Sequence, residues 1–540
     1  MIRQNQMKRV YSFIIAMLIA CGSFAQNTTI SELQLRKIQQ AEYYISHGYV
    51  DDVNEEELVD AAIKGMLGQL DPHSTYIKAK DVERTNESLN GSFEGIGVQF
   101  QMIDDTLVVV QPVSGGPCEK QGIIAGDRIV TVNDTAIAGV KMSRDEIMTR
   151  LRGPKGSKVK LGVIRQGVDG INTFNIIRDK IPVYTIDASY MVDKQLGYIR
   201  ISSFGATTYD EFMAAIEKLK KGGMSRLIID LQSNGGGYMQ PAVRLSNEFL
   251  QKDEIIVSQK GNSGLMQAEQ KYKADGSGML KDIPLVILVD SYSASASEIL
   301  TGAIQDNDRG IVVGRRTFGK GLVQRPFELV DGSMIRLTTS HYYTPSGRCI
   351  QKPYEKGDSK SYEGDIESRL NSGELTNVDS IHFEDSLKYQ TTHLKRTVYG
   401  GGGIMPDVYV PLDTTQYTKL HRELSAKGCI NNTVMRYLDQ NRKKLEKRYK
   451  NLETYKKNFE IKDDIYELLL AEADKAKIKY DDEMLETSKP MINNVLKALI
   501  ARDIYENAAY YEISNTTNSI FIKGVEVAKS IDPVNIMNHF

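Results

Sequence analysis

The chain has 540 residues, and its 68 Lys and Arg nearly balance its 70 Asp and Glu, which leaves a formal net charge of −2 at pH 7. A chain of this length is too long to fold around a single hydrophobic core, so about two to four domains are expected. The charge balance gives no support for a nucleic-acid partner. The four cysteines show no metal-binding spacing and the seven histidines include no His-Glu-x-x-His motif, so we expect no metal and no cofactor.

The N-terminus has the pattern of a secretory signal peptide. Two basic residues precede a short apolar run over 10–20, and a small-residue segment ends at Ala25. We therefore expect residues 1–25 to be removed and the mature chain to be exported to the periplasm or cell envelope. An alternative stays open, because Leu18-Ile19-Ala20-Cys21 also resembles a lipoprotein box, in which a lipidated Cys21 would anchor the protein to the membrane.

Residues 27–90 are predicted to form a polar, helical N-terminal region. Apolar residues recur there at helical intervals: Leu33, Ile38, Tyr44, Leu58, Ile63 and Leu67. The segment Leu70-Asp71-Pro72-His73-Ser74 breaks this pattern, because Asp and Pro favour turns. His73 is a candidate catalytic histidine, but a structural turn residue is the favoured interpretation.

Residues 92–180 are predicted to form a compact unit of short strands and one helix. Apolar runs separated by glycine-rich turns indicate the strands, and Ser143 with Glu146 gives the capping-box pattern of a helix start. The order of these elements resembles a PDZ domain. The resemblance implies that Gly95-Ile96-Gly97-Val98 binds the terminal carboxylate of a peptide through backbone N–H groups, while the peptide adds to the edge of the sheet as a strand.

Residues 183–411 are predicted to contain a parallel sheet. Apolar runs at 197–201 and 227–231 flank a helical pattern over 208–220, and this strand-helix-strand order is typical of parallel strands. The second run leads into the glycine-rich segment Asp230-Leu231-Gln232-Ser233-Asn234-Gly235-Gly236-Gly237. Such a segment presents bare backbone N–H groups to a ligand, and a plain strand-to-helix turn is the alternative.

A third apolar run, Leu285–Val289, indicates a strand buried on both faces. Small residues follow over 291–297, and helical spacing begins at Glu298. A strand, a tight turn and a helix together expose one side chain beside the free N–H groups of the helix N-terminus, which suits a nucleophile and its oxyanion. Lys320 follows between two glycines, and burial there would lower its pKa from about 10.4 toward the roughly 7–8 that a general base needs.

Each feature alone is typical of a helix cap or a surface turn, but their order and spacing favour a catalytic site. The segments Ser293-Ala294-Ser295-Ala296-Ser297-Glu298-Ile299 and Thr317-Phe318-Gly319-Lys320-Gly321-Leu322-Val323-Gln324 resemble the signature of the carboxyl-terminal processing peptidases, also called tail-specific proteases. The resemblance covers residues 70–410, including the Leu-Asp-Pro-His-Ser segment. In the glycine-rich segment 230–237, Gln232 occupies a position where the family usually has arginine.

This resemblance implies a role for each matching residue of the signature. Ser295 would be the nucleophile, Lys320 would be the base, and Gln324 would orient the lysine amine. The resemblance also implies a crotonase-like (ClpP/crotonase-type) α/β peptidase core, which the PDZ domain precedes and which carries helical N- and C-terminal extensions.

The resemblance further implies an oxyanion hole. This hole would combine the backbone N–H of Ala296 with that of Gly235 or Gly236. Asp306 matches an aspartate position of the family and is a candidate supporting residue whose role stays open.

Two regions lie outside the signature. Residues 353–396 are rich in charge and poor in apolar residues, so we expect a polar insertion that runs over the surface of the core. Residues 415–540 change character, with helical patterns over 434–455, 464–477 and 482–508. We expect a separate C-terminal helical extension there, and packing, dimerisation and docking of a partner are all open as its role.

The expected function is that of a serine endopeptidase that recognises exposed C-terminal tails of proteins through the PDZ domain and cleaves with a Ser-Lys dyad through an acyl-enzyme. Its expected partners are protein or peptide substrates with exposed C-termini, and the helical ends are compatible with a homo-oligomer. Two alternatives remain open. One is a catalytically silent PDZ-type adaptor of the cell envelope that holds tails, and the other is a crotonase-type enzyme that acts on thioesters.

Overall fold

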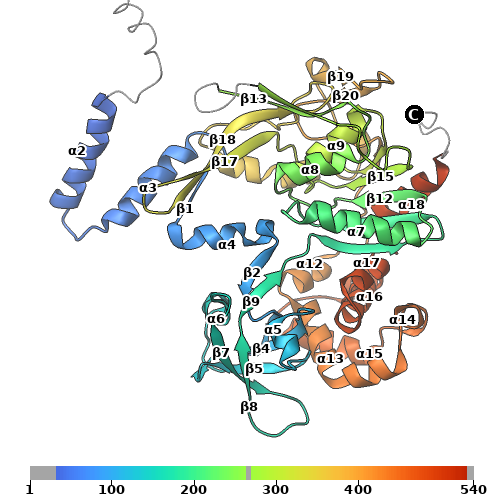
Figure 1. The fold of residues 1–540 in the computed structure, drawn as a ribbon. Coiled ribbons are helices and arrows are strands. Elements are labelled where there is room, and N and C mark those ends of the chain that lie inside the picture. Colours follow the sequence, from blue (N-terminus) through green and yellow to red (C-terminus); the bar gives the residue numbers. More distant parts are fainter. Residues whose placement is uncertain (1–31, 263–268, 532–540) are drawn as a thin grey trace, which may run out of the picture.

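The computed structural model describes residues 32–262 and 269–531 (Figure 1). The predicted signal peptide, its cleavage site and Cys21 lie outside these residues. In the described part of the chain, no helix is both long enough and apolar enough to cross a membrane. The chain forms an N-terminal helical region, a small β-rich domain, a larger α/β core and a C-terminal helical region (Figure 1).

The α/β core is organised around one six-stranded sheet. Its strands lie in the order β10 (Ile186–Met191), β11 (Leu196–Ile201), β12 (Arg226–Asp230), β15 (Leu285–Val289), β16 (Ile311–Gly314) and β21 (Val408–Tyr409). The pair β10–β11 is antiparallel and the other neighbours are parallel. All five residues of β15 are buried, as expected for an apolar strand in the middle of a parallel sheet.

Helices cover both faces of this sheet. One face packs against α7 (Thr208–Lys221), α8 (Met239–Asn247) and α9 (Ala296–Asp306), and Ile287 belongs to their apolar cluster. The other face packs against α18 (Ser519–Ser530), whose cluster includes Leu288. Because successive side chains of a strand point to opposite faces, β15 contributes to both layers and holds the turn that follows it in a fixed place.

A second sheet contains the two strands that come directly after Lys320 in the chain. It contains β1 (Thr75–Ile77), β18 (Met334–Tyr343), β13 (Ile255–Gly261) and β14 (Glu269–Lys273), and β17 (Leu322–Glu328) pairs with β18. Strand β1 comes from the N-terminal region and places Thr75 opposite Arg336. The N-terminal region is therefore tied to the strands that follow Lys320 in the chain.

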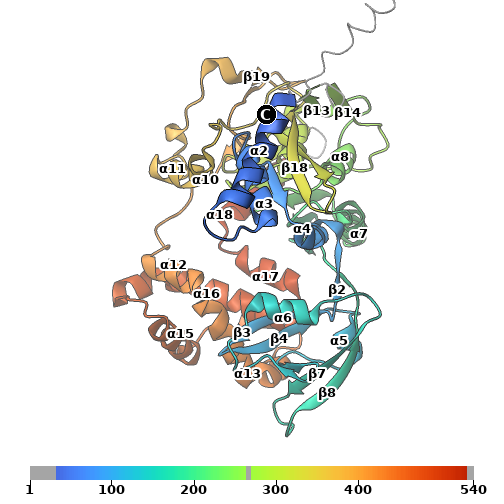
Figure 2. The same ribbon diagram turned by 90° about the vertical axis from the view of Figure 1, so that its left-hand side faces the viewer.

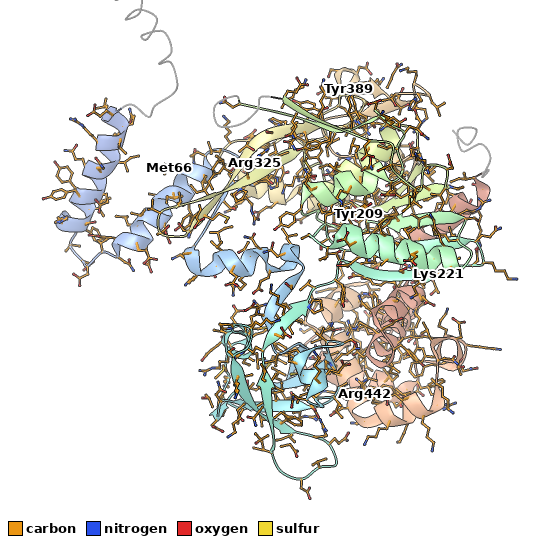
Figure 3. The ribbon with its side chains drawn as sticks, in the orientation of Figure 1. Met66, Tyr209, Lys221, Arg325, Tyr389 and Arg442 are labelled. Carbon is orange, nitrogen blue, oxygen red and sulfur yellow. The ribbon has the colours of Figure 1, made fainter. Side chains whose placement is uncertain are left out.

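The N-terminal region contains α2 (Glu32–Gly48), α3 (Glu55–Gly68) and α4 (Ala79–Asn90). No residue of α2 is buried, and this helix projects from the body of the molecule (Figure 1). Large apolar side chains are exposed on α2 and α3, among them Met66, which Figure 3 labels: Leu33, Leu35, Ile38, Tyr43, Tyr44, Ile45, Val59 and Met66. These two helices thus present an apolar surface that the rest of the described chain does not bury.

The small β-rich domain lies in the lower part of Figure 1. Its elements are β2 (Ser92–Gly95), β3 (Val98–Ile103), β4 (Thr106–Pro112), α5 (Pro117–Lys120), β5 (Arg128–Val132), β6 (Thr135–Ala136), α6 (Arg144–Leu151), β7 (Lys158–Ile164), β8 (Asn172–Ile177) and β9 (Asp179–Pro182). The main sheet has the order β3-β4-β5-β7-β8, so β3 is an end strand. Ser143 caps α6 by accepting the Glu146 N–H at 3.2 Å, which is the contact that the sequence pattern predicts.

The C-terminal region is helical and continues to the α18 that covers the core sheet. Its other helices are α12 (Lys419–Ala426), α13 (Cys429–Arg448), α14 (Leu452–Asn458), α15 (Asp463–Lys475), α16 (Asp482–Ile504) and α17 (Asn507–Ser514). The single helix predicted over 434–455 is in fact two helices. The physical reason is Asn451, which caps a new helix by accepting the Thr454 N–H at 2.9 Å.

This C-terminal region contacts both other domains. Met435 on α13 packs against Val108 and Val110 of β4, and Arg128 on β5 forms an ion pair of 2.5 Å with Asp439. Towards the core, α17 packs against β10, while α18 packs against β12, β15 and β16. The region therefore bridges the small β-rich domain and the core, and both views show it beside the two (Figures 1 and 2).

The polar insertion over 353–396 is folded against the core rather than simply running over its surface. It contains α10 (Ser359–Glu363), α11 (Asp365–Asn371), the short 3₁₀ helices η1 (Val378–Ser380) and η2 (Asp385–Leu387), and the strand β19 (Lys388–Gln390), which pairs with β20 (Thr397–Tyr399) directly after the insertion. Tyr362 and Arg369 are buried. Polar side chains can anchor such a segment because buried carbonyl and carboxylate groups elsewhere need donors. One part of the insertion contacts residues 316–318 of the core. Residues 316–321 are here called the lysine loop.

Candidate active site

The serine-rich turn lies where the buried strand β15 leads into α9. Ser295 immediately precedes α9 and has φ +57° and ψ −112°, a conformation that a non-glycine residue keeps only when its surroundings impose it. Hydrogen bonds to its backbone hold it in place. Its N–H donates to Glu298 Oε2 at 2.8 Å, and the Tyr342 hydroxyl donates to its carbonyl at 3.2 Å. The strained backbone leaves the half-buried Ser295 side chain at the end of the core sheet.

Glu298 joins the serine turn to the lysine loop, and its side chain is fully buried. Its Oε2 accepts the N–H groups of Ser295 at 2.8 Å and Lys320 at 2.9 Å. Its Oε1 accepts the Gly319 N–H at 2.7 Å and the Thr317 hydroxyl at 2.5 Å. Burial raises the pKa of Glu298, and these hydrogen bonds oppose the rise. One side chain therefore fixes the backbones of both predicted catalytic residues.

The glycine-rich loop after β12 packs directly against the serine turn. A side-chain carbon on Gly236 would lie 2.8 Å from Cβ of Ser295 and 2.9 Å from the nitrogen of Ala296, and its φ of +98° also favours glycine. Ala296 is the first residue of α9, so its N–H has no acceptor within the helix. The Gly236 N–H donates to Asn234 Oδ1 at 2.8 Å, whereas Gly235 is exposed. The structure thus places Gly236 and Ala296 at Ser295, and Gly235 precedes Gly236 in the same loop.

Two neighbouring serines fasten this loop to the turn. Ser293 Oγ donates to the Leu231 carbonyl at 2.8 Å, and Ser297 Oγ donates to the Asn234 carbonyl at 2.9 Å. The Ala294 N–H donates to the same Asn234 carbonyl at 2.9 Å. These contacts give the Ser293 and Ser297 hydroxyl groups structural partners in the glycine-rich loop.

The surroundings of Lys320 favour its neutral form. Burial lowers the pKa of the Lys320 amine, and the Arg336 guanidinium lowers it further. The carboxylates of Glu298 and Asp71 act in the opposite direction. Because a desolvated amine loses its charge more readily, this environment suits a residue that must accept a proton from a hydroxyl group.

The insertion supports the lysine loop from outside. Arg369 on α11 donates to the carbonyl oxygens of Thr317 at 2.8 Å and Phe318 at 3.1 Å. Glu374 forms an ion pair of 2.5 Å with Arg316 at the start of the loop. The loop that carries Lys320 is therefore held on one side by Glu298 of the core and on the other by the insertion.

The Leu-Asp-Pro-His-Ser segment lies beside the lysine loop. The Asp71 carboxylate accepts the N–H groups of His73 at 2.8 Å and Ser74 at 3.0 Å, which is the turn that the sequence predicts. The His73 ring lies 2.9 Å from the Tyr362 hydroxyl. Burial, followed by the charge of Lys320, lowers the pKa of His73 to about 4. His73 is thus a turn residue whose neutral ring lies near Lys320.

Gln324 and Asp306 differ in where the structure places them. The Gln324 amide donates to Thr338 Oγ1 on the neighbouring strand at 3.2 Å. Asp306 is the last residue of the 11-residue helix α9, which puts it about 15 Å along the helix from its start. There it forms a fully buried ion pair of 2.7 Å with Arg348. Asp306 therefore stabilises the far end of α9 and does not lie at the serine turn.

Gln232 departs from the family pattern, and the structure shows what surrounds it. Its amide donates to the buried Asp230 carboxylate at 3.2 Å. Arg200 on β11 forms an ion pair of 2.9 Å with the same carboxylate and donates to the Gln232 carbonyl at 2.7 Å. An arginine thus contacts Asp230, although it comes from a neighbouring strand rather than from position 232.

The predicted peptide-binding loop borders a cavity of about 310 Å³ in the small β-rich domain. The cavity lies between β3 and α6, with these lining residues: Phe93, Gly95, Ile96, Gly97, Val98, Gln99, Phe100, Arg144, Met148, Leu151 and Arg152. Arg144 lies over the Phe100 ring, 5.4 Å from its centroid. The cavity therefore combines apolar walls with guanidinium groups at the helix side.

Backbone hydrogen bonds fix the direction of this loop. The Ile96 carbonyl accepts the Cys118 N–H at 3.1 Å, and the Gly97 carbonyl accepts the Val113 N–H at 3.0 Å. In a trans peptide, the N–H of the next residue points away from such a carbonyl. The N–H groups of Gly97 and Val98 therefore point away from these contacts, on the side of the exposed β3 edge where an added peptide strand would end.

Sequence reasoning did not single out several residues that the structure places at the site. Glu298 lies within the quoted serine signature, and its place as the third residue of a helix was a usable signal for a residue that holds the turn. Asp71 lies in the quoted turn segment. Tyr362 and Arg369 lie in a region with no recognisable pattern, so the sequence offered no signal for them.

Comparison with known proteins assigns most of these parts to families. Residues 195–360 match the model of peptidase family S41, and residues 95–176 match that of the PDZ domain. Residues 19–81 match a model described as the activating protease CtpB N-terminal domain. Residues 420–506, in the helical C-terminal region, match DUF8443, a family of unknown function.

Individual proteins are similar over most of the chain. The carboxy-terminal processing protease CtpA of Bacillus subtilis (strain 168) is 34% identical over 439 residues, which cover 76% of this chain and 90% of CtpA. The carboxy-terminal processing protease CtpB of the same organism is 35% identical over 336 residues, which cover 62% of this chain and 69% of CtpB. Among solved structures, the photosystem II D1 C-terminal processing protease is 26% identical with a TM-score of 0.35, and the match covers 72% of this chain and 95% of that one.

Proposed function

The chain belongs to peptidase family S41 and is a carboxy-terminal processing serine protease, and we propose that it cleaves its substrates with the dyad Ser295–Lys320. The observation that carries this proposal is the buried carboxylate of Glu298, which binds the backbone N–H groups of both residues. The strained conformation of the half-buried Ser295 adds support, because residues with strained backbones cluster at active sites.

In the proposed mechanism, neutral Lys320 takes the proton from Ser295 Oγ, and the oxygen attacks the scissile carbonyl carbon. The oxyanion receives hydrogen bonds from the Ala296 N–H and from the glycine-rich loop. Because the Gly236 N–H already donates to Asn234, Gly235 is the favoured second donor. The lysine ammonium then protonates the leaving amine, and an acyl-enzyme remains on Ser295. Lys320 next deprotonates a water molecule, which hydrolyses the ester.

The PDZ domain supplies substrate recognition in this proposal. The terminal carboxylate of a tail binds the N–H groups of Gly97 and Val98, and the tail adds to β3 as an extra strand. Its last side chain enters the apolar part of the cavity, near Ile96, Met148 and Leu151. The substrates are accordingly proteins or peptides with an exposed, apolar C-terminus.

The proposal also includes the finer fold and the location. The parallel order β11-β12-β15-β16 with helices on both faces supports a crotonase-type core. The leader pattern of residues 1–25, or a lipidated Cys21, supports a place in the periplasm or cell envelope. The alternative of a silent adaptor has lost its support, since the chain is a protease of the S41 family.

The test is proteolysis of one unfolded protein that ends in a free apolar C-terminus, compared with the same protein carrying an amidated C-terminus. The parent enzyme is expected to cleave the free form faster, and Ser295→Ala and Lys320→Ala are expected to lose cleavage of both. Cleavage by Lys320→Ala at the parental rate would refute the dyad. Equal cleavage of free and amidated tails would refute carboxylate recognition and leave the dyad intact.

A further inference from the structure

A chain of hydrogen bonds connects the N-terminal region to Gln324. The Gln324 amide donates to Thr338 Oγ1 at 3.2 Å, and the Thr338 hydroxyl donates to Asp71 Oδ1 at 3.0 Å. A second connection runs through Ser74, whose hydroxyl accepts the Thr338 N–H at 3.1 Å and donates to Asp71 Oδ2 at 2.6 Å. Asp71 is 8% exposed. A buried carboxylate from outside the core thus fixes the strand residue that holds Gln324.

Asp71 also belongs to the charged surroundings of Lys320. The titratable groups around the lysine are Asp71 and His73 from the turn, Glu298 from α9 and Arg336 from β18, and Lys352 acts on His73. The two carboxylates stabilise the ammonium form of Lys320, and the guanidinium destabilises it. His73 is neutral above about pH 4, because burial lowers its pKa to about 4. Asp71 therefore offsets part of the effect of Arg336 on the lysine.

A role in the turn alone does not account for these contacts. An aspartate that merely shapes a turn needs only the N–H groups of His73 and Ser74, which Asp71 does bind. Asp71 in addition reaches β18 through Thr338, and β1 directly after the turn pairs with the same strand. The turn is thereby held against the sheet that carries Gln324.

We propose that Asp71 is a positioning residue of the peptidase site, which holds the Gln324 amide through Thr338 and adds a negative charge to the surroundings of the lysine loop. The inference rests on the proposed Ser295–Lys320 dyad. It makes the turn before β1 a part of the active site, so the N-terminal region contributes to catalysis as well as to the fold.

The first test removes the relay hydroxyl. Thr338→Val keeps the shape of the side chain but leaves the Gln324 amide and Asp71 without their shared partner. We expect kcat to fall about tenfold or more, the scale of a misplaced acid–base group, while KM stays within about twofold. Thr338→Ser, which keeps the hydroxyl, should restore most of kcat. Thr339→Val is the matched control, because the Thr339 hydroxyl makes only a 3.5 Å contact with the Val323 carbonyl, and it should behave as the parent.

The second test reads the lysine without any substrate. The pH dependence of the reaction of Lys320 with an amine-reactive reagent, followed by peptide mass spectrometry, reports the protonation of its amine. Asp71→Asn removes a negative charge that stabilises the ammonium, so the midpoint of labelling should move to lower pH. The same measurement on Thr339→Val should give the parental midpoint.

The outcomes separate this inference from the proposed dyad. Equal losses of kcat in Thr338→Val and Thr338→Ser, or an unchanged labelling midpoint in Asp71→Asn, would overturn the positioning role. If Lys320→Ala keeps the parental activity, the dyad fails instead, and the labelling midpoint still decides whether Asp71 acts on the lysine.

Discussion

Replacing Glu298 by Gln changes one atom and should damage both stability and catalysis. Three of the four groups that donate to this side chain are backbone N–H groups, which can only donate and cannot accept a hydrogen bond. The glutamine is best placed with its NH₂ group in the position of Oε1, because the Thr317 hydroxyl can turn and accept. The Gly319 N–H is then left buried without an acceptor. This unpaired N–H costs about 1–3 kcal/mol, and the hydrogen bonds from the Ser295 and Lys320 N–H groups lose their charged acceptor. The free energy of unfolding should therefore fall by about 2–4 kcal/mol.

The assay combines denaturant unfolding with kcat on a tail-bearing substrate. Because the serine turn and the lysine loop would lose their common anchor, kcat should fall about a hundredfold, the scale of a small misplacement of reacting groups. The matched control is Glu211→Gln. Glu211 also binds backbone N–H groups, those of Thr185 at 2.8 Å and Ile186 at 3.0 Å, which belong neither to the serine turn nor to the lysine loop. The control should lose stability but keep kcat. If Glu298→Gln keeps the parental stability and kcat, Glu298 does not hold the site as an ionised carboxylate.

The remaining predictions concern the lysine, the groove and the N-terminal helices. Burial lowers the pKa of Lys320 from 10.5, so the unfolded chain binds this proton more readily, and the native state loses stability as pH falls from 10.5 to the native pKa. Lys320→Met should therefore raise the free energy of unfolding at pH 7 by about 1 kcal/mol. An equal gain at pH 11, where the unfolded lysine is also neutral, would contradict this cause. Arg144 lies about 6 Å along α6 from Met148, which is the length of two residues in a strand. Tails with an acidic third-last residue should therefore bind more tightly to the parent than to Arg144→Glu. Titration calorimetry with acidic and basic tails tests this, and an Arg144→Glu variant that still prefers acidic tails would refute it. Deleting residues 32–50 removes the exposed apolar helix α2, and sedimentation should then show a smaller assembly, whereas a parent that is already monomeric would rule out this interface.

Local patterns in the sequence were enough to predict the serine turn and the strands around it. The apolar run of β15 and the helical spacing of α9 depend on neighbouring residues, and the structure has both elements where the patterns indicate them. The capped start of α6 is likewise a local signal, confirmed by the bond between Ser143 and the Glu146 N–H. Where a residue acts through its neighbours in the chain, its type and spacing are informative.

The parts that escaped prediction depend on contacts between distant segments. Asp71 binds Thr338 across 267 positions of the sequence, and no periodicity records such a pair. Arg369 anchors the insertion by donating to backbone carbonyls of the lysine loop, which any residue type would offer. The charged composition of the insertion therefore looked like an exposed loop, although its buried arginine makes it a support of the site.

The central claim is tested most directly by trapping the acyl-enzyme. A single turnover with a tail-bearing substrate is quenched with acid, and the modified residue is located by peptide mass spectrometry. We expect an acyl group on Ser295 in the parent and none in the Lys320→Ala variant. An acyl group on another residue, or equal acylation of Ser295 without Lys320, would contradict it.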